Sequence, residues 1–409
     1  MNTELFGKAL HIEKPFYVKE VRFDKSLKRL DVDIDFIRGS EFLYNEGSYD
    51  ESCKAYDTKQ KTWRHLNFFE HECHLNARVP RVKLKDGSTK LIKTPWEGLS
   101  FGFTLLFEAL CMELCKFMPV SNVGDIIKES DDKLWSMLDK YVDSGRELED
   151  FNDVVSIGVD ETSKKKNHDY ITLFVDLARK KTIFITEGKS NQTIKDFKED
   201  LELHNGKVEN IKNVSCDMSP AFIKGVRENL PEAEITFDKF HILKIINEAV
   251  DKVRKEETKT TDLLKGFRYI FLKNNSNLTK KQAIKLEELS MSKLNLKSIR
   301  ALHIRENFQE IYNAKTSDDF LLLLKKWYFW ATHSRLEPIK KAAYSIKRHW
   351  EGVLKWFESK INNGILEGLN SIIQACKAKA RGYKTTKNFK IIVYLVTGDL
   401  KFDKINPNM

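Results

Sequence analysis

The spacing of apolar and polar residues divides the first part of the chain into two modules. The stretch 30–36, LDVDIDF, alternates apolar residues with Asp, and the stretches WRHLNFF and ECHLNARVPRVKL continue this extended pattern. The stretch 104–117, TLLFEALCMELCKF, has a helical period instead. We therefore predict a small β-rich module over residues 1–100 and a helical domain over residues 101–150.

Two further helices are predicted after Pro119, which breaks the first one. Ser121 can cap a short helix, and Ser130 can cap the next, which begins at Asp131. Three helices joined by tight turns are typical of a helix-turn-helix unit. The third helix begins with Asp131 and Asp132 rather than with Arg or Lys. The pattern therefore leaves open whether this helix contacts DNA or packs against a neighbouring element.

After Asp150 the pattern is that of an α/β domain. VVSIGVDETS, DYITLFVDL and TIFITEG predict three consecutive strands, followed by a helix, the strand VSCD, a helix, the strand EITF and another helix. This order, βββαβαβα, resembles the ribonuclease-H-like mixed sheet, in which the first strand is central and pairs in parallel with the fourth. We predict the first part of this core over residues 151–245, an all-α insertion over 246–355, and a last core helix with a basic C-terminal segment over 356–409.

Two carboxylates are expected to meet in the middle of this sheet. Alternation along the first strand puts Asp160 at the strand end, on the face opposite Ile157 and Val159. Asp217 ends the fourth strand, which would lie beside the first. Adjacent carboxylates raise each other's pKa unless a cation lies between them, so the pair predicts a divalent metal site. Two Mg²⁺ or Mn²⁺ ions held by Asp oxygens serve phosphodiester attack, and a third carboxylate normally completes such a site.

The third carboxylate is predicted in the helix of ILEGLNSIIQACKAKARGY, which Gly382 can end. Four apolar residues at helical spacing predict its buried stripe: Ile365, Leu369, Ile372 and Cys376. Five polar residues share another face: Glu367, Asn370, Gln374, Lys377 and Arg381. Glu367 would then point toward the metals, and the side chains of Lys377 and Arg381 would continue the same face toward phosphates. An ordinary solvated helix face is the alternative for this glutamate taken alone.

Composition narrows the class of protein. A chain of 409 residues with 41% hydrophobic and 32% charged side chains can bury sizeable cores, which excludes a disordered tail. Lys and Arg number 70 against 60 Asp and Glu, so the net charge of +10 favours a polyanionic partner, nucleic acid first. Scattered cysteines and an N-terminus without an apolar signal core predict a reducing, cytoplasmic location.

Several long motifs resemble those of one family in the family's own order. GVDETSKKKNHDYITLFVDL, CDMSPAFIKGVRENLPEAEITFDKFHILK and LEGLNSIIQACKAKARGYKTTKNF resemble the ISL-three family of bacterial insertion-sequence transposases, which are DDE recombinases. The likeness covers nearly the whole chain. It implies that Asp160, Asp217 and Glu367 are both the catalytic triad and the ligands of two Mg²⁺ or Mn²⁺ ions, with the helical insertion between the last two.

The resemblance also implies roles for residues outside the triad. Asp238 and His241, in FDKFH, form a D-x-x-H motif that would position the scissile phosphate or the last helix. A helix-capping pair without chemistry is the alternative, because the motif is not unique to one reaction. Six residues of the last helix and the segment after it would contact DNA: Asn370, Gln374, Lys377, Lys379, Arg381 and Lys384.

The N-terminal module is expected to be finger-like but without zinc. Members of the family usually carry a zinc finger with paired Cys ligands. The corresponding places, near Glu46 and Tyr49 and near Leu84 and Gly87, hold no Cys or His. His and Cys residues elsewhere in the module do not form the paired motif that a zinc ribbon needs.

The resemblance implies a bacterial transposase that binds terminal inverted repeats in double-stranded DNA and carries out metal-dependent cleavage and strand transfer into target DNA. At least a dimer is expected on DNA, because two element ends must be held together, and the cytoplasmic protein would be nucleoid-associated when bound. Two other functions remain open: a retired transposase that only binds DNA, and a structure-selective nuclease such as a ribonuclease H or resolvase, which performs no strand transfer.

Overall fold

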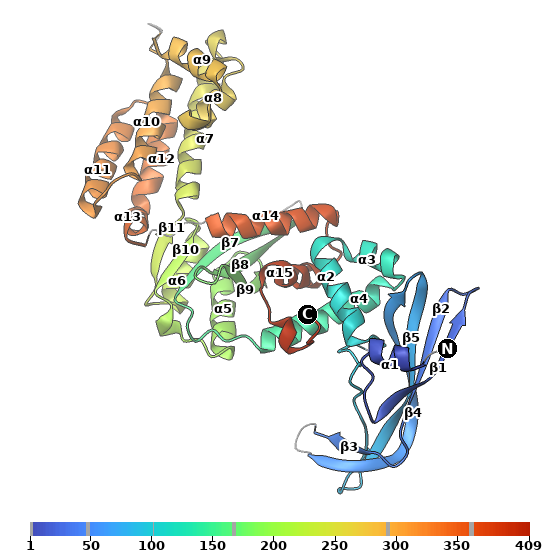
Figure 1. Cartoon of the computed structure of the whole chain (residues 1–409). Coiled ribbons are helices and arrows are strands. Elements are labelled where there is room, and N and C mark those ends of the chain that lie inside the picture. Colours follow the sequence, from blue (N-terminus) through green and yellow to red (C-terminus); the bar gives the residue numbers. More distant parts are fainter. Residues whose placement is uncertain (1–2, 46–49, 101, 166–168, 292–294, 360–363) are drawn as a thin grey trace. The chain divides into compact units, whose positions relative to one another are not determined.

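The computed structural model divides the chain into two compact units (Figure 1). Unit 1 comprises Met1–Glu149 with Ala375–Met409, and unit 2 comprises Asp150–Gln374. The five-part division predicted from the sequence is finer than this and stays a prediction. No helix among the described residues is long and apolar enough to cross a membrane. The described residues are 3–45, 50–100, 102–165, 169–291, 295–359 and 364–409.

The N-terminal part of unit 1 is a six-stranded sheet with the order β1-β2-β5-β4-β3, and β6 pairs with β5. β2 and β5 run parallel, and the other neighbours run antiparallel. The predicted extended stretches lie in β2, β4 and β5, whereas β1, β3 and β6 were not predicted. The elements are α1 (Thr3–Ala9), β1 (Phe16–Asp24), β2 (Arg29–Phe36), β3 (Glu41–Tyr44), β4 (Glu51–Phe68), β5 (His71–Lys83) and β6 (Thr89–Leu91).

The positions where the family's zinc ligands are expected lie only partly within the described residues. Those near Glu46 and Tyr49 fall outside them. Leu84 is buried, with 3% of its surface exposed, and Gly87 lies in the turn between β5 and β6. Cys53 and Cys73, in β4 and β5, are free thiols.

The rest of unit 1 is helical: α2 (Leu105–Phe117), α3 (Val120–Ile127), α4 (Asp131–Glu147) and, from the C-terminal segment, α15 (Thr386–Thr397). The prediction that Ser121 caps α3 is wrong, because the N-cap position is Pro119. Val120, Val123 and Ile127 form the buried face of α3, so the helix has to include Val120. Ser130 precedes α4 as predicted, but its side chain makes no capping hydrogen bond. The sequence pattern did not predict α15.

Unit 2 contains a five-stranded mixed sheet with the order β11-β10-β7-β8-β9. β7 pairs antiparallel with β8 and parallel with β10, so it is central, and β11 extends the parallel half. The mixed α/β class predicted from the sequence is thereby confirmed. The elements are β7 (Ser156–Lys165), β8 (Asp169–Asp176), β9 (Lys181–Glu187), α5 (Gln192–Leu203), β10 (Asn213–Cys216), α6 (Pro220–Asn229) and β11 (Glu234–Phe237).

One face of this sheet is apolar and is covered by α5 and α6 (Figure 1). Ile157 and Val159 of β7 belong to the same buried cluster as Phe197 of α5 and Val226 of α6. The alternate residues of β7, among them Gly158 and Asp160, lie on the opposite face of the sheet. That second face receives the first part of α14 (Gly364–Lys379), which follows a long helical excursion.

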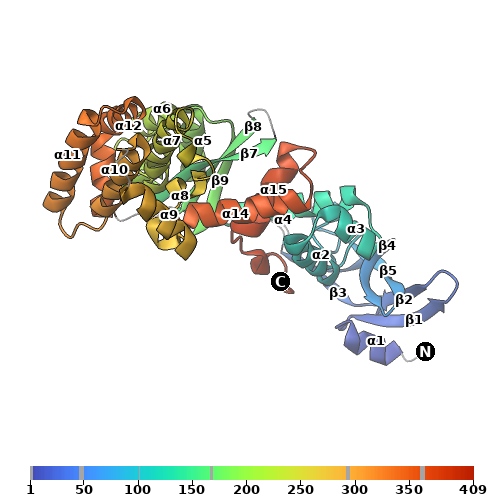
Figure 2. The ribbon, with the colours of Figure 1, turned by 90° about the horizontal axis from the view of Figure 1, so that it is seen from above.

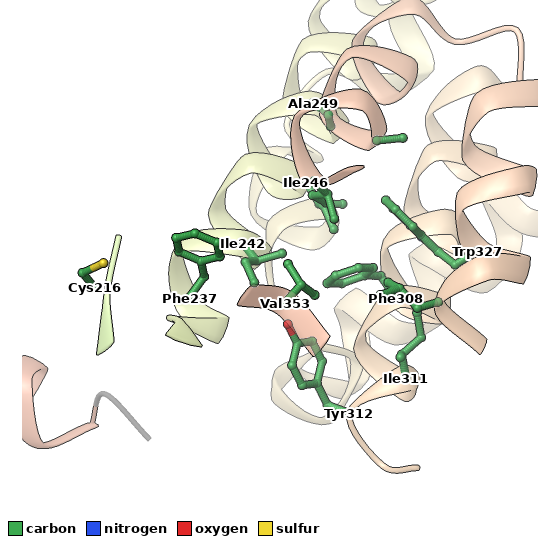
Figure 3. Close-up of a cluster of buried hydrophobic side chains, with 14 of the residues drawn as sticks. Cys216, Phe237, Ile242, Ile246, Ala249, Phe308, Ile311, Tyr312, Trp327 and Val353 are labelled. Carbon is green, nitrogen blue, oxygen red and sulfur yellow. The ribbon is translucent and has the colours of Figure 1, made fainter. Parts of the chain in front are cut away.

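The excursion begins with α7 (Lys239–Thr258) and forms a bundle in which α10 and α12 pack on α7 (Figures 1 and 2). Ile242 and Ile246 of α7 pack with Phe308 and Trp327 in the bundle core (Figure 3). Trp327 Nε1 donates to the Ile304 carbonyl oxygen at 2.8 Å, which satisfies the buried indole. The other helices are α8 (Arg268–Leu272), α9 (Lys280–Met291), α10 (Lys297–Ile311), α11 (Ser317–His333), α12 (Glu337–Arg348) and α13 (Trp350–Ser359). Short 3₁₀ helices lie at Val208–Asn210, Asp262–Leu264, Asn275–Asn277 and Phe402–Lys404.

A partly buried histidine in β4 predicts acid sensitivity of unit 1. Burial, and then the charge of Arg64, lower the pKa of His65 from 6.5 to about 4. The unfolded chain therefore binds a proton between these two values that the folded chain refuses, and stability falls as pH drops from 6.5 toward 4. The loss from this one group is roughly 3 kcal/mol. We expect His65→Gln to lose less stability than the wild type between pH 7 and pH 4, measured by urea unfolding at each pH; equal losses would contradict this assignment.

Candidate functional site

Asp160 lies within β7 and not at its end. The prediction of a strand end is wrong, because the second half of β7 continues as an antiparallel partner of β8, up to Lys165 paired with Asp169. The parallel pairing with β10 is shorter and ends where Ser215 pairs with Gly158. Asp160 therefore lies two residues past the last parallel pair, beyond the point where β10 ends at Cys216.

The register places three aspartates at equivalent positions on three neighbouring strands. Two residues beyond the Ser215–Gly158 pair, the same alignment matches Asp217 with Asp160. One residue beyond the Cys216–Phe237 pair of β10 and β11, it matches Asp217 with Asp238. Matched residues of parallel strands point to the same face. The ends of β10 and β11 thus bring carboxylates to the level of Asp160.

Electrostatics link these groups. Burial, with smaller contributions from the charges of Asp217 and Asp238, raises the pKa of Asp160. Two groups oppose this and favour the charged carboxylate: the backbone N–H of Glu161, which donates to Asp160 Oδ1 at 2.8 Å, and the side chain of His241. The cluster is therefore one of like charges that the protein stabilises only in part.

Asp238 and His241 are held together at the start of α7. Asp238 Oδ1 accepts a hydrogen bond from Phe240 N at 3.0 Å and so caps the helix, while Oδ2 accepts from His241 Nδ1, also at 3.0 Å. That hydrogen bond, and then the charges of Asp238, Asp160 and Asp217, raise the pKa of His241 against the effect of burial. The motif is thus a helix cap whose imidazole lies close enough to the other carboxylates for their charges to raise its pKa. Its role toward a phosphate stays a prediction.

Helix α14 presents a different face to the sheet from the predicted one. Its buried residues are Leu366 and Ile373, whereas Ile372 of the predicted stripe is 45% exposed. Ile365, Leu369 and Cys376 of that stripe are partly buried, so the most deeply buried positions lie one residue beyond the predicted ones. The reason is that Leu366 packs over Gly158 of β7. A Cβ atom at position 158 would lie 2.8 Å from Leu366 Cδ1, so the glycine leaves the space that the leucine occupies.

Glu367 consequently lies on the exposed flank of α14. No group of three or more His, Cys, Asp or Glu side chains within the described ranges is arranged to hold a metal ion. The structure brings Asp160 and Asp217 to matched positions, and it does not place Glu367 with them. The three-carboxylate site therefore stays a prediction.

The polar residues that follow Glu367 have varied surroundings. Asn370 Nδ2 donates to Asp160 Oδ2, and Gln374 Nε2 donates to Thr162 Oγ1 at 2.9 Å. The sequence reasoning missed Thr162, although strand alternation places it on the same face as Asp160.

The basic residues at the end of α14 belong to unit 1. Lys379 Nζ donates to the Phe117 carbonyl oxygen at 3.4 Å, and Arg381 and Lys384 are exposed. The helix ends at Lys379. Arg381, with φ +54°, takes the left-handed position that was predicted for glycine, and Gly382 follows with φ +100° and donates its N–H to the Lys377 carbonyl oxygen. DNA contact by these residues, by Lys377 and by the two amides above stays a prediction.

Comparison with known proteins identifies the family. A family model described as a transposase, of the ISL-three DDE type, matches residues 157–393, more than half of the chain. The chain belongs to the ISL-three family of insertion-sequence transposases. The matched segment of this transposase includes Asp160, Asp217 and Glu367. The family implies DNA as partner and a divalent metal as cofactor.

Two relatives support the same conclusion over most of the chain. The transposase is 26% identical over 352 residues to the transposase for insertion sequence element IS1001 of Bordetella parapertussis. This alignment covers 82% of this chain and 84% of the relative. It is 23% identical over 427 aligned residues to the transposase for insertion sequence element IS1557 of Mycobacterium tuberculosis, with 94% and 93% covered. The prediction of an insertion-sequence transposase, and hence of a DNA transposase enzyme, is confirmed.

The Asp238–His241 contact yields a spectroscopic prediction. Asp238→Asn keeps a side chain that can cap α7 but removes the negative charge that favours the imidazolium. We expect the pKa of His241, followed by the NMR shifts of its ring protons, to fall toward or below its ordinary value of 6.5. The circular dichroism of the helices should stay unchanged. A His241 pKa that does not move would show that the contact does not set the charge of the ring.

Proposed function

We propose that this transposase binds the terminal inverted repeats of its element and cuts and joins DNA in a ribonuclease-H-like core. The support for the core is the order of its strands, three in antiparallel succession followed by two in parallel beside the first. The single observation that carries the proposal is the matched position of Asp160 and Asp217 on the central strand pair. Asp160, Asp217 and Glu367 would be the catalytic carboxylates.

The two aspartates fit a divalent cation. Carboxylate oxygens are the ligands that Mg²⁺ and Mn²⁺ take in proteins, and the raised pKa of Asp160 reflects burial and negative neighbours that such an ion would offset. When bound, ions of this kind lower the pKa of an attacking water and stabilise the leaving oxygen of a phosphodiester. Mg²⁺ or Mn²⁺, as a pair of ions, is our proposal for the cofactor.

Glu367 is assigned on different grounds. It lies in the family match, and it precedes by three residues Asn370, whose amide contacts Asp160. Residues three apart on a helix lie on neighbouring parts of its surface, so the glutamate is about one helical turn from Asn370, which contacts Asp160. Its exposed side chain has to turn toward Asp160 and Asp217 to join them.

The remaining residues of the site would act on the DNA. The imidazolium of His241, which Asp238 orients, would hold a non-bridging phosphate oxygen beside the carboxylates. Water attacks the phosphodiester at the element end first, and the freed 3′-hydroxyl then attacks target DNA in the same site. No covalent bond between protein and DNA is needed. Four cations at the end of α14 and after it would contact phosphates: Lys377, Lys379, Arg381 and Lys384.

The N-terminal sheet and helices α2 to α4 would supply recognition of the terminal repeats, the helices as a helix-turn-helix unit and the sheet without zinc. A dimer or larger assembly on DNA follows from the need to hold two ends. One observation favours a second candidate function, a retired transposase that binds DNA without cutting it: among the described residues, Glu367 is exposed and does not complete a metal-holding group with Asp160 and Asp217.

The decisive measurement is strand transfer by the purified full chain on a labelled duplex carrying the element's own end, in Mg²⁺ and in Mn²⁺. We expect joined products from the wild type and losses of roughly 1,000-fold or more from Asp160→Ala, Asp217→Ala and Glu367→Gln, the order expected when a catalytic group is removed. All three variants should still bind the duplex.

Each alternative has its own outcome. Binding without cleavage by the wild type, with both ends supplied, would support the retired DNA-binding protein. Cleavage of duplexes that lack a terminal repeat, without joined products, would support a structure-selective nuclease.

A further inference from the structure

Helix α14 contacts β7 through three pairs of residues at regular spacing. Leu366 packs over Gly158, Asn370 donates to Asp160, and Gln374 donates to Thr162. Each step moves four residues along the helix and two along the strand, in the same direction. We call this series the α14–β7 ladder.

The regular spacing has a geometric basis. Four residues of an α-helix rise about 6 Å, and two residues of a strand span about 6.6 Å. Residues four apart on a helix share a face, as do residues two apart on a strand. The two elements can therefore match contact for contact over the length of the ladder. A slide of the helix by one residue would break all three pairs at once.

The middle pair of the ladder differs from the other two because it includes a carboxylate of the proposed site. The donor must be the amide nitrogen of Asn370, since a flipped amide would place its oxygen against the negative charge of Asp160. The amide oxygen, Oδ1, is buried and has no hydrogen-bond partner among the described residues. Leaving a buried acceptor unpaired costs roughly 1–3 kcal/mol.

This cost is one that an apolar residue at position 370 would avoid. Leu366 on the same helix face shows that an apolar contact with β7 is feasible there. The presence of a polar side chain with one unsatisfied atom at this position therefore points to a task beyond packing.

We propose that Asn370 is a positioning residue, which fixes the orientation of the Asp160 carboxylate and at the same time holds α14, and with it Glu367, at a set distance along β7. The proposal rests on the proposed function, because it concerns the same carboxylate site. It replaces, for Asn370, the DNA contact predicted from the sequence. With Oδ1 of Asp160 held by the N–H of Glu161 and Oδ2 by Asn370, the carboxylate cannot rotate freely.

An oriented carboxylate binds a cation more tightly than a mobile one. Residues that hydrogen-bond to metal ligands typically change metal affinity or activity by about 10- to 100-fold when they are removed. The neighbouring pair provides a control of the same kind, because Gln374 and Thr162 join the same helix to the same strand without touching a carboxylate.

The test compares Asn370→Leu with Thr162→Val in the full-length protein. Both variants are close in size to the residue they replace, and each removes one hydrogen bond of the α14–β7 ladder. Binding of Mn²⁺ is measured by electron paramagnetic resonance, thermal unfolding gives the stability, and cleavage of an element-end duplex gives the activity. Asn370→Ser, whose side chain is too short to reach Asp160, is the second variant in case the leucine impairs folding.

We expect Asn370→Leu and Asn370→Ser to bind Mn²⁺ about 10-fold or more weakly and to cleave correspondingly slowly. Thr162→Val should keep the Mn²⁺ affinity of the wild type, although we expect it to lose as much thermal stability as the Asn370 variants or more. Wild-type affinity in the Asn370 variants, or an equal loss in Thr162→Val, would overturn the proposal.

Asp160→Ala separates this proposal from the proposed function. If Mn²⁺ binding falls in Asp160→Ala and not in the Asn370 variants, the metal site stands and the positioning role fails. If Mn²⁺ binding is unchanged in Asp160→Ala, the proposed metal site fails, and the positioning role fails with it.

Discussion

The proposed site of this transposase depends on the parallel pairing of β7 with β10. Backbone hydrogen bonds between these strands align Ser215 with Gly158, and that register carries Asp217 to the level of Asp160. A slip by one residue would turn one of the two carboxylates to the opposite face. Branched residues protect the register, since Ile157 and Val214 are completely buried in the cluster beneath α5 and α6.

The same register concentrates negative charge where water is partly excluded. Asp160, Asp217 and Asp238 end up on one side of the sheet, and burial raises the pKa of Asp160. Hydrogen-bond donors lie beside these carboxylates: His241 donates to Asp238, and Asn370 donates to Asp160. Hydrogen bonds and positive charge favour the ionised carboxylate, which is the form that the proposed chemistry uses.

Helix α14 contacts both the central strand β7 and the carboxylate of Asp160. Its apolar Leu366 fits the space left by Gly158, and its amides reach the next two residues on the same face of β7. The helix that carries Glu367 is therefore positioned by contacts with the strand that carries Asp160. The glutamate itself stays exposed, so the place that we propose for it beside the other carboxylates requires its side chain to turn.

The sequence by itself determined the order of strands and helices in unit 2, and the family. Periods of two and of about 3.6 residues are local properties, so β11 covers the predicted stretch EITF without a shift at either end. Long motifs in a fixed order made the transposase recognisable without coordinates.

Only the tertiary structure decided which way α14 faces. Ile365, Leu369 and Ile372 form as good an apolar stripe as the observed one by period alone. The preferred face depends on the missing side chain of Gly158 and on the carboxylate of Asp160, both on a strand some 200 residues away in sequence, as the separation of 210 between Asp160 and Asn370 shows. The same holds for the length of β7, which β8 extends past Asp160. Such contacts depend on long-range packing, which no local pattern encodes.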